Sequence, residues 1–323
     1  LALPSSQTVR WSAGGLDRRR HHRGSVRGEA APLEDADDDG SSRPGAAFSV
    51  VYDDGDVVVA CKDSGLLTVP GIGAHKRDSL QERLRSALRC PSLKTAHRLD
   101  RDTSGLVALA RSPEAHAGLA RAFEARTVTK RYVARVRVAL GSRLFVAASN
   151  TTTTNGGRTS LGVVRGEIRA PIAVRRAPAT PRVVVASDGR PSVTRWRLVV
   201  RTVGWEDDPW RDTTAALLAL VPVTGRTQQL RVHLAHLGTP IVGDALHGGN
   251  LLGASAASVS SSSPQRLCLH AYRLAFRHPL LPDRWIDLTA PAPFASDHEN
   301  HLLLTGPDFF CEHDDDDRGR TTT

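Results

Sequence analysis

One acidic side chain of this sequence lies where a catalytic carboxylate is expected. Asp100 falls in the polar, turn-forming stretch His97–Gly105, after a helical pattern and before the apolar run 105–110. That run is typical of a buried strand, so the acid lies at a junction between rigid elements. Scaffolded connecting segments often hold catalytic groups, but Asp, Thr, Ser and Gly also favour turns through local hydrogen bonds. Taken alone, Asp100 is more simply explained as a turn residue.

A second block, Gly225–His233, changes that interpretation. Together the two blocks resemble the RluA-like family of pseudouridine synthases, and the resemblance covers most of residues 47–296. The family cleaves the N-glycosidic bond of a uridine, turns the base and rejoins it to the sugar through carbon 5. The reaction consumes no redox or phosphate energy, so the resemblance implies no cofactor, no metal, and rRNA or tRNA as the partner.

This chemistry sets demands on the side chains around the target uridine. An ionised carboxylate must act as nucleophile or stabilise positive charge, and a base must later remove the C5 proton. Because that carboxylate is desolvated under a bound base, it needs a fixed cation to stay ionised. At about 4 Å and an effective dielectric near 20, one such pair is worth roughly 4 kcal/mol. The uridine must also be extruded and held against an aromatic or apolar wall.

The resemblance assigns these tasks to particular residues. The block around Asp100 is similar to the motif that carries the catalytic aspartate, and Lys130-Arg131-Tyr132 resembles the block that provides the active-site tyrosine, Tyr132. Residues 229–233 resemble the block that supplies an apolar contact, Leu230, and the arginine that pairs with the acid, Arg231. We therefore expect a catalytic set of Asp100, Tyr132 and Arg231, with Leu230 packing on the flipped base.

Two arginines in these blocks, Arg98 and Arg226, have either a functional or a structural role. Arg98 either contacts a phosphate or helps to flip the base, or it forms a structural salt bridge. Arg226 has the same alternatives, with the further option of supporting Asp100. His233 and His236 have the i, i+3 spacing of a metal pair, but no acidic motif accompanies them, so structural histidines are expected.

The sequence departs from the family pattern at two positions. Asp63 stands where the family usually has proline, and Gln228 replaces the usual histidine. Both departures concern loop geometry more than the reaction. The segments Pro240–Asp244 and Leu269–Leu274 are similar to further family segments and are expected to be structural.

Composition agrees with a polyanionic partner. Lys and Arg number 43 against 34 for Asp and Glu, which gives a net charge of +9. Basic side chains that replace counterions around phosphates supply sequence-independent affinity for RNA, although solubility or a targeting arm also explains such charge. The chain is 40% hydrophobic without a long apolar segment, so no membrane span is expected. The four cysteines form no Cys-x-x-Cys pair and are expected to be free thiols.

The pattern along the chain divides it into three parts. Residues 1–46 form an Arg-rich and then acidic leader, either a mitochondrial or plastid transit peptide or a basic arm of a cytoplasmic protein. Residues 47–296 form the catalytic domain, with low-complexity insertions near 141–160 and 254–264. Residues 297–323 are expected to be a disordered acidic tail.

The catalytic domain is expected to be α+β with a mixed, mainly antiparallel sheet, flanking helices and a central cleft. A hairpin is predicted around the Asp53–Asp56 turn, and helices are predicted after Ser79, after Ser112 and after Thr227. Strands are predicted over 105–110, 132–138, 183–186, 193–203 and 215–223.

The predicted function is an RNA pseudouridine synthase that acts as a monomer on rRNA or tRNA. The alternative is a noncatalytic RNA-binding or ribosome-assembly factor that keeps the same fold. The acid, tyrosine and arginine blocks argue against that alternative, because a binding protein has no need to hold a desolvated carboxylate near RNA phosphates. A metal-dependent hydrolase using the histidines lacks a ligand set.

Overall fold

The computed structural model describes residues 45–138, 152–155, 158–161, 164–175, 182–202, 214–248 and 266–305. The leader up to residue 44, the insertion at 254–264, most of the insertion at 141–160 and the residues after 305 lie outside these ranges. No helix in the described ranges has both the length and the apolar character needed to cross a bilayer.

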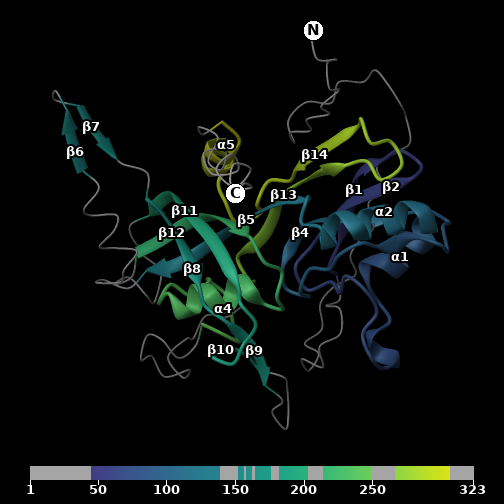
Figure 1. The fold of residues 1–323 in the computed structure, drawn as a ribbon, viewed down its shortest axis with the longest axis horizontal. Coiled ribbons are helices and arrows are strands. Elements are labelled where there is room, and N and C mark those ends of the chain that lie inside the picture. Colours follow the sequence, from purple (N-terminus) through teal and green to yellow (C-terminus); the bar gives the residue numbers. More distant parts are fainter. Residues whose placement is uncertain are drawn as a thin grey trace, which may run out of the picture.

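The order of elements is mixed, with strands outnumbering helices (Figure 1). The helical segments are η1 (Ala74–Lys76), α1 (Leu80–Ala87), α2 (Pro113–Glu124), α4 (Gln229–His236) and α5 (Asp297–Thr305). The strands are β1 (Phe48–Asp53), β2 (Val57–Lys62), β3 (Lys94–Thr95), β4 (Ser104–Ala110), β5 (Thr129–Val138), β6 (Thr152–Asn155), β7 (Arg158–Leu161), β8 (Arg165–Arg169), β9 (Ile172–Arg175), β10 (Arg182–Val185), β11 (Val193–Thr202), β12 (Thr214–Pro222), β13 (Leu269–Arg277) and β14 (Trp285–Thr289).

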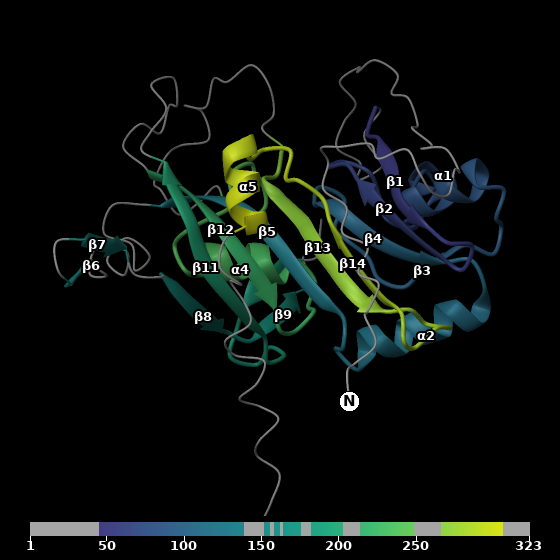
Figure 2. The same cartoon turned by 90° about the horizontal axis from the view of Figure 1, so that it is seen from above.

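One large sheet organises these elements, in the order β1-β2-β4-β13-β5-β12-β11-β8. Within this sheet every strand pair is antiparallel except β4 with β13, so the sheet is mixed and mainly antiparallel as predicted. The pairs β9–β10 and β6–β7 form separate two-stranded sheets. In Figure 2, β13 lies at the middle of the large sheet, between the part built from β1, β2 and β4 and the part built from β5, β12 and β11.

Helices α1 and α2 cover opposite faces of the β1–β2–β4 part. Val57 and Val59 of β2 pack in one cluster with Leu119 of α2, whereas Val58 packs in another with Leu84 of α1. Alternate residues of a strand point to opposite faces, which explains the two clusters. All seven residues of β4 are buried. The apolar run after Asp100 is therefore a strand covered on both faces, as the sequence indicates.

The local signals in the sequence fix most element ends. Ser79 and Ser112 each accept a hydrogen bond from a backbone N–H of the first helical turn, from Glu82 and Ala115 respectively, and so cap α1 and α2 as predicted. The third predicted helix is present as α4, but its N-cap is Gln228 rather than Thr227. Gln228 adopts a left-handed conformation (φ 51°) and provides no side-chain cap.

The predicted tail from residue 297 is wrong over its first nine residues, which form helix α5. Ser296 and Glu299 make reciprocal hydrogen bonds between side chain and backbone, a capping box that starts the helix. Glu299 also pairs with buried Arg135 of β5 at 2.9 Å. The helix is therefore tied to the sheet by a buried ion pair, and the Ser-x-x-Glu spacing was the signal that predicts it.

The parallel contact between β4 and β13 depends on Gly105. This residue has φ +115°, and an added Cβ would lie 2.4 Å from the carbonyl oxygen of Ala271. We expect Gly105→Ala to lower the free energy of unfolding by about 3 kcal/mol or more, through backbone strain and overpacking. Urea denaturation measures this change. Gly55→Ala is the matched control, because Gly55 has φ +97° but no atom within 4 Å of an added Cβ; an equal loss in both variants would show that strain alone, not the contact with β13, sets the cost.

Candidate active site

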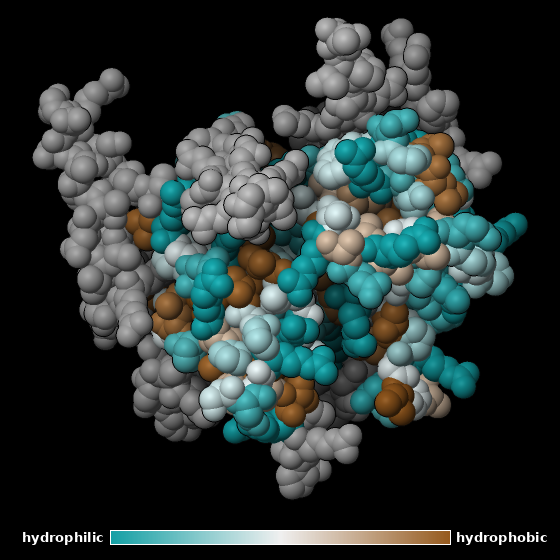
Figure 3. Space-filling view, viewed as in Figure 1, coloured by the Kyte–Doolittle hydropathy of each residue, from teal (hydrophilic) through white to brown (hydrophobic). Residues whose placement is uncertain are grey.

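A cleft of about 2270 Å³ opens between the two parts of the large sheet. Its lining combines the loop before β4, the start of β5, the strands β8 and β11, and the segment that leads into α4. Figure 3 shows a mainly hydrophilic face that is hollowed near its centre. Among the residues that the structure describes, eleven lysines and arginines but only two acidic residues, Asp100 and Glu167, line the cleft. Such a surface suits a polyanion.

The loop that carries Asp100 is held by backbone contacts on both sides of the acid. The Thr68 hydroxyl donates to the carbonyl of Leu99 (2.8 Å) and accepts from its N–H (3.1 Å). The N–H of Gly65 donates to the carbonyl of Arg101 (2.9 Å). The segment 65–68 therefore fixes the residues that flank Asp100, and the acid is presented from a rigid loop.

Lys62 strengthens the same anchor from beneath the loop. Its side chain is fully buried, and its Nζ donates to the carbonyls of Asp63 (2.9 Å), Leu66 (2.7 Å) and Arg101 (2.8 Å). Burial lowers the pKa of Lys62 to about 7, although Asp102 and Asp100 favour its charged form. No role was predicted from the sequence for Lys62, the neighbour of Asp63.

The departure at Asp63 fits this loop. Its N–H donates to the carbonyl of Ala47 (3.0 Å), and its carboxylate accepts from the N–H of Ala47 (3.3 Å). A proline at position 63 has no N–H to donate. The substitution therefore adds a contact to the chain before β1 and leaves Asp100 untouched.

Arg231 lies beside Asp100 but is held mainly by another acid. Its Nη1 is 4.0 Å from Oδ2 of Asp100. Its Nε and Nη2 donate to the two carboxylate oxygens of Asp244, at 2.9 and 2.7 Å. This bidentate pair fixes the plane of the guanidinium and leaves Nη1 directed to Asp100. The predicted proximity of Asp100 and Arg231 is therefore present, and Asp244 is the orienting partner that the sequence analysis treated as structural.

Asp244 is itself fixed by further hydrogen bonds. Its Oδ1 also accepts from the N–H groups of Leu246 and His247, both at 3.0 Å. Burial disfavours its charge, but the bonds from Arg231 and the backbone hold the pKa of Asp244 below its ordinary value. Nε2 of His247 lies 2.9 Å from Oε1 of Gln228, so the replaced histidine position still joins this network.

Burial dominates the electrostatics of Asp100. It raises the pKa of this carboxyl above the ordinary value of 3.8, while Arg231, Arg98 and Lys62 oppose the rise. The side chain keeps 30% of its surface exposed to the cleft. The result is a partly desolvated carboxylate that is more basic than an ordinary aspartate and has cations around it.

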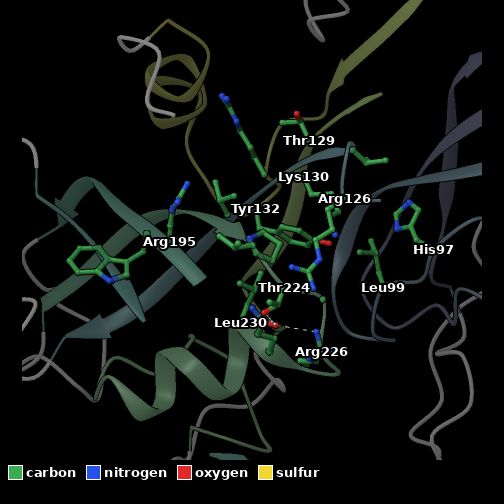
Figure 4. Close-up of a pocket in the computed structure, with 18 of the residues that line it drawn as sticks. His97, Leu99, Arg126, Thr129, Lys130, Tyr132, Arg195, Thr224, Arg226 and Leu230 are labelled. Atoms are coloured by element: carbon green, nitrogen blue, oxygen red, sulfur yellow. Dashed lines mark hydrogen bonds between the residues drawn. The ribbon is translucent and has the colours of Figure 1, made fainter. Parts of the chain in front are cut away.

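Tyr132 and Leu230 line the same cleft as this acid, and Figure 4 labels both side chains. Tyr132 packs between two hydrophobic clusters, one of which includes Ala134, Val136 and Leu230. Burial and the charge of Asp100 raise the pKa of the Tyr132 phenol, so it stays protonated at neutral pH. Leu230 is 6% exposed. Both residues therefore lie where the sequence analysis expects a surface for a flipped base.

The two remaining predicted residues line the same cleft. Arg98 is exposed next to Asp100. Nη2 of Arg226 lies 3.4 Å from the carbonyl of Pro191, and its backbone N–H donates to Oε1 of Gln229 (3.0 Å). No bond joins Arg226 to Asp100 in the described part of the chain. The described residues therefore do not support the option that Arg226 holds Asp100, and a contact of Arg226 with RNA stays a prediction.

His233 of α4 makes the hydrogen bonds of a structural histidine. The ring nitrogens of buried His233 lie 2.9 Å from the Thr194 hydroxyl and 3.0 Å from the Ala170 carbonyl, as expected for a structural histidine.

A group of possible metal ligands lies at the β1–β2 turn, comprising Asp54, Asp56 and His278. Nδ1 of His278 accepts two backbone N–H bonds, so Nε2 carries the proton and faces Asp54 at 3.0 Å. Asp54 also accepts hydrogen bonds from the Tyr52 hydroxyl and from the N–H groups of Asp56 and Val57, so protein donors already engage both of its oxygens.

Comparison with known proteins identifies the family of this chain. Residues 56–236 match the family model described as RNA pseudouridylate synthase. The chain is 32% identical to the dual-specificity RNA pseudouridine synthase RluA of Vibrio cholerae, over 79% of this chain and 87% of the relative. It is 35% identical to the ribosomal large subunit pseudouridine synthase D of Xanthomonas campestris, over 76% of this chain and 66% of the relative.

A solved structure shows the same fold. Human RNA pseudouridylate synthase domain containing 1 is 26% identical and superposes with a TM-score of 0.53, covering 77% of this chain and 84% of the human chain. Family membership favours an enzyme that binds RNA over a noncatalytic factor. The basic cleft, the aspartate loop and these matches lead to one conclusion: the chain belongs to the RluA-like family of RNA pseudouridine synthases and is an isomerase.

Proposed function

We propose that this enzyme isomerises particular uridines in rRNA or tRNA through Asp100, without a cofactor. The observation that carries the proposal is the meeting of Asp100, Arg231 and Tyr132 at one basic cleft, although they come from three distant segments. The name of the Xanthomonas relative points to rRNA of the large subunit as one substrate class.

Each side chain has a defined task in the proposed reaction. Asp100 is the nucleophile toward the sugar or base, or it stabilises positive charge on the sugar, while the bond between C1′ and N1 breaks. The uracil leaves with the electron pair of that bond and turns, and its C5 forms a bond to C1′. A base then removes the C5 proton while N1 takes up a proton, which restores the ring. Tyr132 and Leu230 pack on the extruded base, and Arg231 favours the ionised form of Asp100. Atoms balance without any co-reactant, because the product is an isomer.

Tritium release tests the proposal. RNA labelled at C5 of uridine loses its tritium to water when the C1′–C5 bond forms and the C5 proton leaves. We expect the wild-type protein to release tritium from a cellular rRNA or tRNA fraction without added metal or cofactor. Release from no fraction, or release only after a cofactor is supplied, would contradict the proposed function.

The raised pKa of Asp100 predicts the pH dependence of this reaction. The ionised form is active, so single-turnover rates fall as the pH falls through the pKa of Asp100. Because burial raises that pKa, we expect the acid limb of the rate profile to lie above 3.8, the ordinary value for aspartate. Circular dichroism at each pH shows whether the protein is still folded. A midpoint at or below the ordinary value in folded protein would refute the assignment of burial as the dominant influence.

A further inference from the structure

A cationic corner lies at one end of the cleft, where α2 leads into β5. It consists of Arg126, Lys130, His97 and Phe123, which all line the cleft. Figure 4 labels the first three of these residues. The His97 ring stacks on Phe123 with centroids 4.4 Å apart. Nζ of Lys130 lies 5.9 Å from the centroid of the same ring. The aromatic pair thus supports the ammonium group.

His97 contributes a neutral hydrogen-bond donor to this corner. Its Nε2 accepts the N–H of Ala108 at 3.0 Å, which places the proton on Nδ1. Burial, and next the charge of Lys130, lower the pKa of His97 to about 3. Among the described residues, Nδ1 has no hydrogen-bond partner. The ring therefore leaves one N–H for a ligand.

The positive charge of the corner is not neutralised by the described residues. Burial and the neighbouring Arg126 both lower the pKa of Lys130, and no carboxylate opposes them. The two acids of the cleft are engaged elsewhere, Asp100 near Arg231 and Glu167 with Arg169 and Arg195. A half-buried ammonium beside a second cation is unfavourable unless an anion joins it. The missing partner is therefore an anion supplied by the ligand.

The position of Lys130 places that anion close to the target base. Lys130 and Tyr132 are two residues apart on β5, so their side chains lie on the same face at about 7 Å spacing. Nζ of Lys130 is also 4.0 Å from the point that a Cβ on Gly225 would occupy. The ammonium therefore reaches from β5 toward the segment that carries Arg226.

We propose that Arg126 and Lys130 together bind one phosphate of the substrate RNA next to the uridine held by Tyr132. This inference rests on the proposed function, which identifies the ligand as RNA. Its chemistry needs only a phosphodiester, two cations and the N–H of His97. Lys130 and Arg126 are binding residues here, and the chemical step remains with Asp100.

The salt dependence of RNA binding tests this site. Unfractionated tRNA labelled with fluorescein at its 3′ end is titrated with protein by anisotropy at several KCl concentrations. All proteins carry Asp100→Asn, so that no turnover occurs. We expect Lys130→Gln and Arg126→Gln each to weaken binding roughly 3- to 10-fold and the double variant to reduce the slope of log Kd against log[KCl] by about one. Lys130→Arg should retain the slope.

The matched control is Arg121→Gln, which removes an exposed charge on α2, five residues before Arg126 and outside the cleft. If Lys130→Gln and Arg126→Gln change the slope of log Kd against log[KCl] no more than this control does, the phosphate site is overturned. A reduction of about two in the double variant would overturn the sharing of one phosphate. If the wild type releases tritium but the cleft variants leave the slope unchanged, only the phosphate site is rejected. If the cleft variants alter the slope but the wild type never releases tritium, only the proposed function is rejected.

Discussion

Replacing Asp100 by asparagine is expected to reduce tritium release by at least roughly 10⁴-fold, because a neutral amide is neither a nucleophile nor a stabiliser of positive charge. The fold should survive the change. In the described part of the chain the Asp100 carboxylate accepts no hydrogen bond, and its nearest cation is 4.0 Å away. Single-turnover assays at saturating RNA measure the chemical step separately from binding.

The same variant should be at least as stable as the wild type at neutral pH. Burial raises the pKa of Asp100, so the charged form is disfavoured in the folded state above that pKa. Asparagine removes this cost while keeping the shape, and thermal unfolding at pH 7 should therefore give an equal or higher Tm. Asp102→Asn, two residues along the same turn, is the control and should keep most of the turnover. Loss of turnover in both variants, or a clearly lower Tm for Asp100→Asn, would contradict the role given to Asp100.

Arg231→Gln is expected to lower the single-turnover rate by about 10²- to 10³-fold, the range found when one preorganised electrostatic group is removed. Glutamine cannot supply the positive charge that opposes protonation of Asp100. The acid limb of the pH profile should therefore move to higher pH than in the wild type. RNA affinity should change less than the rate, because Arg231 is buried and engaged with Asp244.

A stability loss accompanies this variant and needs its own control. Asp244 is 1% exposed and would lose its charged partner, which costs about 3 to 5 kcal/mol for a buried pair. Arg135→Gln breaks a comparably buried pair with Glu299, and Arg135 does not line the cleft. We expect it to destabilise the protein similarly without moving the acid limb. The electrostatic role of Arg231 would be contradicted if Arg135→Gln shifted the acid limb of the pH–rate profile, or if Arg231→Gln did not.

Local patterns in the sequence were sufficient for most elements. The hairpin around Asp53–Asp56, the caps at Ser79 and Ser112, and the strands over 193–203 and 215–223 all depend on neighbouring residues, and the structure confirms them. Helix α5 also had a local signal, the Ser-x-x-Glu pair, but the acidic residues that follow obscured it. The left-handed cap at Gln228 had no such signal, because Gln is not a residue typical of this conformation.

The site was predictable only in part, because some of its contacts are not local. The proximity of Asp100 to Arg231 followed from the resemblance, but the bidentate bond from Arg231 to Asp244 joins residues that no periodic pattern connects. Likewise, Lys62 reaches the Arg101 carbonyl across 39 residues of sequence. Such side-chain contacts follow from the register of the sheet and not from residue spacing.

The position of β13 has a consequence for how the protein is made. This strand pairs with β4 on one side and β5 on the other, although it follows them by more than a hundred residues in the chain. During translation, β4 and β5 leave the ribosome long before their shared neighbour exists, and each exposes an unpaired edge in the interval. Long-range pairing of this kind is slow and leaves intermediates open to aggregation. Strand β14 pairs with β13 in the same sheet, so the nascent enzyme cannot complete the sheet until residue 289 has emerged, and we expect chaperones to assist its synthesis.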